Sequence, residues 1–193
     1  MSGGRVSVDA LKSDLRSILR EVVVDGDGRI FYRGVRYIFL DQDLFMSSFE
    51  EMMKGLGASM KTLLFPFVEL SGYTVAKQLM DSGVPPERVI EAYAEYNNPR
   101  GWGLTEVVKV DFEKLEFVVR MYNQYVSAWL KENVKDLDRS FPFYECSWGY
   151  SWVGVVKAAL ERLGRPRMRL DVKETECLAR GGRFCEFVVK GEE

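Results

Sequence analysis

The first part of the chain repeats apolar residues at helical spacing. Within residues 7–24 they recur three and four positions apart, which predicts an amphipathic N-terminal helix with Ser7 or Asp9 as its cap. The apolar stripe of this helix comprises Val8, Leu11, Leu15, Ile18, Leu19 and Val22. Such a stripe requires burial, either against the edge of a sheet or in a dimer.

Three further segments have helical spacing, at residues 43–56, 58–82 and 86–96. The third begins at a pair of prolines, which is typical of the first turn of a helix. Pro66 lies inside the second segment, where it predicts a kink or a break, because proline donates no backbone hydrogen bond.

β-Branched and aromatic residues that alternate with polar ones predict three β-hairpins. They occupy residues 29–41, residues 104–125 with a turn at 111–114, and residues 167–178 with 184–189. A helix over residues 147–163 precedes the third hairpin and ends at Gly164, a common stop signal.

This order of elements predicts the fold class. Consecutive strands joined by tight turns form an antiparallel sheet, so we expect an α+β fold with helices packed on one face, plus the N-terminal helix. The sequence contains no repeat, low-complexity segment or linker. We therefore divide it into an N-terminal amphipathic helix, residues 1–25, and a single domain, residues 26–193.

Composition narrows the possible functions. The chain has 193 residues, a net charge of -2 and interspersed charges of both signs, so we expect no direct binding to nucleic acid. Its most apolar run, "TLLFPFVEL", is too short for a membrane span. The N-terminus lacks the apolar core of a secretory signal, and we expect a cytoplasmic protein. Histidine is absent, which excludes imidazole as a catalytic base or metal ligand.

The stretch "ETECLARGGRFCEFVV", residues 174–189, carries the candidate metal chemistry. A turn at residues 180–182 places Cys177 opposite Cys185 on adjacent strands, close enough for both thiolates to bind one zinc ion. Glu174 can join them only if a bulge or strand end near residue 175 changes the alternation of side chains. Cys146, just before the predicted helix, is a candidate fourth ligand. Cross-strand cysteines can equally be small buried apolar residues.

The same stretch resembles the closing signature of the vinyl-4-reductase domain family. Three other segments resemble family elements in the same order: "LGASMKTLLFPFVELSGYTVAKQL", "GWGLTEVVKVDFEKLEFVVRMYNQY" and "GYSWVGVVKAALERLGRP". The resemblance covers residues 29–190. It implies an α+β fold shared with the ligand-binding domains of aromatic-sensing activators and with transport protein particle subunits, and it implies a homodimer.

The resemblance also implies a structural zinc ion as cofactor. Carried over by motif, its ligands are Glu174, Cys177 and Cys185, with Cys146 as the fourth. The reductase activity in the family name has little support here. "GWGLTE" lacks the last glycine of a dinucleotide-binding motif and leads into a strand rather than a helix, so we expect no enzymatic activity from this chain alone.

Aromatic residues near the last predicted helix and the middle hairpin are candidates for a ligand pocket. Their rings could surround a small hydrophobic molecule, although core or dimer packing explains them equally well. The candidates are Trp102, Tyr122, Phe143, Trp148 and Trp152. The sensor branch of the family holds a phenol with a histidine and a tryptophan, and without histidine that mode of recognition cannot be copied.

These observations favour a dimeric, non-enzymatic, sensor-type domain that binds a small hydrophobic ligand, contains structural zinc and signals through a regulatory or assembly partner. One alternative is a scaffold protein like the transport-particle subunits. Another is an accessory subunit of a tetrapyrrole vinyl reductase, whose partner would carry the redox cofactor. All three share one fold, so the fold cannot choose among them.

Overall fold

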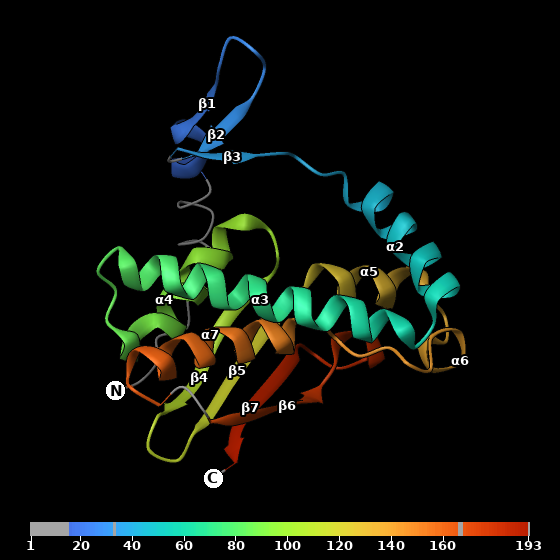
Figure 1. Cartoon of the computed structure of the whole chain (residues 1–193). Coiled ribbons are helices and arrows are strands. Elements are labelled where there is room, and N and C mark those ends of the chain that lie inside the picture. Colours follow the sequence, from blue (N-terminus) through green and yellow to red (C-terminus); the bar gives the residue numbers. More distant parts are fainter. Residues whose placement is uncertain (1–15, 33, 166–167, 193) are drawn as a thin grey trace.

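The computed structural model describes residues 16–32, 34–165 and 168–192 and contains two antiparallel sheets (Figure 1). The larger sheet has the strand order β4-β5-β7-β6. Its strands are β4 (Leu104–Asp111), β5 (Glu116–Tyr122), β6 (Arg169–Glu176) and β7 (Cys185–Glu192). Helices cover one face of this sheet, as Figure 1 shows, and the predicted α+β class is confirmed.

The smaller sheet contains one strand more than the predicted hairpin. Its strands are β1 (Val22–Val24), β2 (Ile30–Tyr32) and β3 (Val35–Tyr37), paired in that order. Residues 16–21 are helical, while residues 1–15 of the predicted N-terminal helix lie outside the described residues. The prediction was wrong for the three valines of β1, because three consecutive β-branched side chains favour a strand that pairs with β2.

Helices and short 3-10 turns connect the strands along the chain. They are α2 (Gln42–Leu56), α3 (Ser59–Asp81), η1 (Pro86–Arg88), α4 (Val89–Asn97), η2 (Asn98–Arg100), α5 (Tyr125–Asn133), α6 (Leu137–Ser140), α7 (Trp148–Arg162) and η3 (Leu178–Arg180). None of the helices among the described residues is long and apolar enough to cross a bilayer.

Helix α3 runs through Pro66 without a break, contrary to the predicted interruption. Pro66 is exposed, so water can reach the carbonyl group that the proline leaves without a hydrogen bond. Helix α5 was not predicted, because the pattern of residues 104–125 favours strands up to residue 125. The structure instead caps a helix there, with the Gln124 side chain accepting a hydrogen bond from the Ser127 amide.

Helices α3 and α7 approach each other very closely above the larger sheet (Figure 1). A Cβ atom added to Gly72 on α3 would lie 2.1 Å from the Ser151 carbonyl oxygen, and one added to Gly154 on α7 would lie 2.0 Å from the Glu69 carbonyl oxygen. Glycine is therefore required at both positions of this helix crossing. The contact fixes the start of α7, and with it the loop that carries Cys146.

Candidate functional site

A β-bulge in β6 aims the Glu174 side chain into the protein. The pairing of β6 with β7 shifts between Glu174, which faces Phe187, and Glu176, which faces Glu186. Thr175, the residue between them, donates a hydrogen bond from its hydroxyl to the Glu186 carboxylate at 2.7 Å. This is the irregularity near residue 175 that the sequence argument required, and it allows Glu174 and Cys177 to face the same interior region.

The turn after β6 returns the chain to Cys185 at close range. Gly181 adopts a φ of 88°, and the Gly182 amide donates to the Cys177 carbonyl oxygen at 2.9 Å. A Cβ atom on Gly182 would lie 2.7 Å from the same oxygen, so this tight return needs glycine. The Gly-Gly pair thereby sets the positions of the two flanking cysteines.

Three of the four predicted metal ligands meet in one buried group. The Cys146 sulfur, a Glu174 carboxylate oxygen and the Cys185 sulfur all lie within 4.8 Å of one another. Cys177 is buried beside this group, where its thiol interacts with both Cys185 and Glu174. Sulfur atoms in a tetrahedral zinc site are about 3.8 Å apart, given zinc–sulfur bonds of about 2.3 Å. Small side-chain movements would therefore bring this group around an ion.

The Glu174 carboxylate shows why the group fits a cation. One of its oxygens, Oε1, is shielded from solvent and has no hydrogen-bond partner among the described residues. Burying a carboxylate oxygen without a hydrogen-bond partner costs free energy, and a bound cation would offset this cost. The set of three sulfurs and one carboxylate oxygen suits zinc.

Burial and mutual proximity raise the pKa values of three candidate ligands, Glu174, Cys177 and Cys185. Burial, followed by the nearby Cys177 thiol, raises the pKa of Glu174 to about 8. The neighbouring Cys185 thiol and then burial raise the pKa of Cys177, and the Cys146 thiol is the main cause of the raised pKa of Cys185. The raised pKa values favour the protonated forms of these three side chains when no cation is bound. Metal binding would release these protons, as thiolate sites require.

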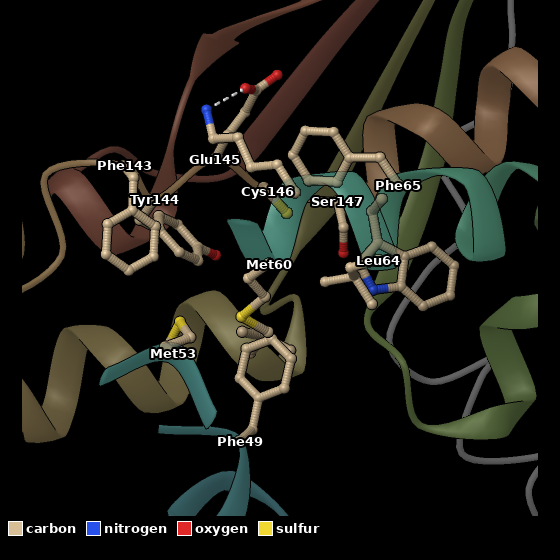
Figure 2. A pocket seen from close by; sticks show the side chains of 13 residues that line it. Phe49, Met53, Met60, Leu64, Phe65, Phe143, Tyr144, Glu145, Cys146 and Ser147 are labelled. Atoms are coloured by element: carbon tan, nitrogen blue, oxygen red, sulfur yellow. Dashed lines mark hydrogen bonds and ion pairs between the residues drawn. The ribbon is translucent and has the colours of Figure 1, made fainter. Parts of the chain in front are cut away.

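A half-open apolar pocket adjoins the metal-ligand group (Figure 2). It lies between α2, α3, α5 and the loop before α7, and its free volume of about 30 Å³ has room for roughly two water molecules. Its lining residues are Phe49, Met53, Met60, Lys61, Leu64, Phe65, Val126 and the six consecutive residues 143–148. Cys146 belongs to both the pocket and the metal-ligand group.

Most of the pocket wall is apolar, and an ion pair in it joins α3 to the loop before α7. Lys61 on α3 donates to the Glu145 carboxylate at 2.8 Å, with both side chains about one third exposed. The ring of Phe65 stacks on Tyr150 with centroids 4.0 Å apart, next to this ion pair. The wall thus combines methionine and aromatic side chains with a few polar groups, as small-molecule sites commonly do.

The predicted pocket residues fall into three places. Phe143 and Trp148 line the pocket, and Trp102 packs against Trp148 with ring centroids 5.6 Å apart. Tyr122 lies on β5, where its hydroxyl donates to Glu106 and its ring contacts Phe184. Trp152 is buried in the core against Tyr93. The structure therefore does not bring all five predicted aromatic residues together.

Sequence reasoning missed the contribution of α2 and α3 to the pocket. Phe49 and Met53 come from α2, while Met60, Leu64 and Phe65 come from α3. Their helical spacing marks them as one apolar face of each helix, but it does not show that the two faces converge on the loop before α7. That convergence depends on the tertiary packing.

The fold matches that of a known ligand sensor. Superposition on the phenol-responsive sensory domain of the transcription activator PoxR, solved with phenol, gives a TM-score of 0.63 over 96% of this chain and 92% of that domain, with 15% identical residues. The chain shares the fold of that sensory domain. Identity at this level establishes the fold alone.

Other comparisons are weaker. A trafficking protein particle complex subunit 3 from Naegleria fowleri, covalently bound to palmitic acid, gives a TM-score of 0.47 with 14% identity, covering 79% of this chain and 95% of that one. A vinyl-4-reductase family protein from Methanocaldococcus jannaschii gives 0.42 with 16% identity, covering 98% and 100%. Neither likeness is strong enough to support an argument about function.

In sequence, an uncharacterized protein of Methanocaldococcus jannaschii is 23% identical over 122 residues, which span 63% of this chain and 62% of that protein. No family model matches the chain.

Proposed function

We propose that this chain is a non-enzymatic sensor domain of the vinyl-4-reductase type that binds a small hydrophobic molecule next to a structural zinc ion. The observation that carries the proposal is the shared loop of residues 143–148, which lines the apolar pocket and contributes Cys146 to the buried ligand group. The likeness in fold to a phenol-responsive sensory domain supports it.

Zinc has a structural role in this proposal. Cys146 comes from the loop before α7, Glu174 from β6 and Cys185 from β7, and Cys177 adjoins them. Four protein ligands complete a tetrahedral site and leave no position for substrate or water. The ion would fasten the last hairpin to the loop that forms one wall of the pocket.

The ligand would enter by displacing flexible side chains. The free volume holds about two water molecules, so a ring or chain requires Met53 and Met60 to change conformation. The pocket is half open to solvent, which provides a path for entry. The loop of residues 143–148 would transmit the effect of ligand binding to a regulatory partner.

Native mass spectrometry tests this function directly. We expect the purified protein to carry one zinc ion per chain and, in addition, the mass of one co-purified small molecule per chain. Leu64→Trp should block the added mass by filling the pocket, whereas Gln78→Trp, exposed on the same helix, should not. A wild-type protein that binds zinc but carries no co-purified small molecule would contradict the sensor function.

A second candidate function, a scaffold for protein assembly, is favoured by the outer face of α3. Its exposed residues between 62 and 74 are all uncharged, and three of them, Leu63, Phe67 and Leu70, are large apolar side chains that are 65%, 69% and 61% exposed. A face without charge is compatible with a second copy of itself, because no like charges would oppose each other in a two-fold interface. Both candidate functions therefore include a homodimer.

Phe67→Glu is expected to convert the dimer to a monomer, because it places a charge opposite its own copy near the centre of the apolar face. Light scattering during size-exclusion chromatography measures the change. The matched control is Val108→Glu on β4, an exposed apolar residue far from α3 in the sequence, which should leave the dimer intact. A wild-type monomer at micromolar concentration, or an unchanged mass for Phe67→Glu, would exclude this interface.

A further inference from the structure

Ser127, in the first turn of α5, touches the metal-ligand group without belonging to it. Its hydroxyl oxygen lies 3.3 Å from the Cys185 sulfur and 3.8 Å from the Cys146 sulfur. Ser127 is fully buried, so these sulfur atoms and the Tyr144 hydroxyl, at 3.1 Å, are its hydrogen-bonding neighbours. A buried hydroxyl between two cysteine sulfurs is placed to donate to a thiolate.

The backbone around Ser127 is held in a fixed position. The Gln124 side chain accepts a hydrogen bond from the Ser127 amide at 2.8 Å, and its same oxygen lies 3.9 Å from the Cys146 sulfur. Gln124 is also fully buried. The start of α5 therefore faces the thiols with its partly positive N-terminal end, which favours negative charge.

Arg180 approaches the same group at Cys177. It is the last residue of η3, its amide donates to the Cys177 carbonyl oxygen at 3.2 Å, and its side chain interacts with the Cys177 thiol. One guanidinium nitrogen donates to the Tyr144 carbonyl oxygen at 2.9 Å, and another donates to Asp138 at 3.0 Å. Arg180 thus connects the last hairpin to the loop that carries Cys146.

The charge of the metal centre explains why both residues matter. Three thiolates and one carboxylate carry four negative charges, of which a divalent cation compensates two. The remaining negative charge is buried, and it requires hydrogen-bond donors or a cation nearby. We infer that Ser127 and Arg180 are positioning residues of the zinc centre, Ser127 donating its one hydroxyl hydrogen to the thiolate of Cys185 or of Cys146, and Arg180 offsetting the charge at Cys177. This inference rests on the proposed zinc site.

Competition with a chromophoric chelator tests the inference on the full chain. We expect Ser127→Ala and Arg180→Gln each to weaken zinc binding by roughly 10- to 100-fold, the usual effect of losing an outer partner of a metal ligand. Arg180→Lys should retain part of the affinity, because it keeps the charge. The matched controls are Ser151→Ala, a buried serine bonded to Tyr93, and Arg162→Gln, an arginine paired with Asp81. Both controls should bind zinc as the wild type does.

Cobalt substitution separates positioning from a general loss of stability. A hydrogen bond to a thiolate lowers the energy of the sulfur lone-pair electrons. Ser127→Ala removes this bond and should therefore shift the thiolate-to-cobalt charge-transfer band to longer wavelength. A merely structural serine would lower the melting temperature of the metal-free protein and leave this band unchanged. Wild-type zinc affinity in both Ser127→Ala and Arg180→Gln would overturn the inference and leave the zinc site intact. A wild-type chain that binds no metal would overturn both this inference and the proposed zinc site.

Discussion

Replacing Cys185 by serine is expected to remove the bound zinc and to lower the melting temperature by about 10 °C. Cys185 is fully buried and lies next to Cys146, Cys177 and Ser127, so no other side chain can take its place. An ion present at a thousand times its dissociation constant contributes about 4 kcal/mol to stability. For a chain of this size each kcal/mol corresponds to about 2 to 4 °C.

Chelator treatment of the wild type provides the control for this prediction. The metal-free wild type should melt near the temperature of Cys185→Ser, and only the wild type should regain stability when zinc is restored. Scanning calorimetry with and without added zinc measures both effects. If chelation leaves the wild-type melting temperature unchanged, zinc does not stabilise the fold, and the cysteines are buried apolar residues.

Gly154→Ala is expected to destabilise the protein by at least about 3 kcal/mol, because it overpacks the crossing of α3 and α7. The new methyl carbon would lie 2.0 Å from the Glu69 carbonyl oxygen and 2.7 Å from the Tyr73 amide nitrogen, and neither backbone atom can move independently of its helix. The helices would have to separate, and α7 would lose contacts along its buried length. Urea unfolding of the metal-bound protein gives the free energy.

Gly55→Ala in α2 is the matched control. A Cβ atom at Gly55 would have no atom within 4 Å, so alanine there should be neutral or stabilise the helix by about 0.5 to 1 kcal/mol. Equal unfolding free energies for the two variants would show that the close approach of α3 and α7 is absent in solution.

The hairpin of residues 174–189 shows how far local sequence determines the candidate site. The two cysteines and the Gly-Gly pair predict a tight return, and the parity of Glu174 and Cys177 predicts a bulge, which β6 contains at Thr175. These features are local, because alternation along a strand fixes the side on which each residue lies. The proximity of Cys146 follows from packing of the preceding loop, which a motif alone cannot specify.

The pocket was harder to predict from the sequence than the hairpin, for a physical reason. Aromatic side chains favour burial in a core and in a ligand site alike, so Trp152 in the core and Trp148 in the pocket wall look equivalent in the sequence. Similarly, the valines of β1 continue a helical stripe, but they pair with β2 once that strand is available. In both cases contacts between distant residues decide between two locally acceptable arrangements.

In the proposed sensor, the shared loop of residues 143–148 would make ligand binding and metal binding thermodynamically reciprocal. A ligand that shifted this loop would change the position of Cys146, and would therefore change the free energy of metal binding. Linkage then requires the metal to change the affinity for the ligand by the same factor. The supply of zinc would thus set the ligand concentration at which such a sensor responds.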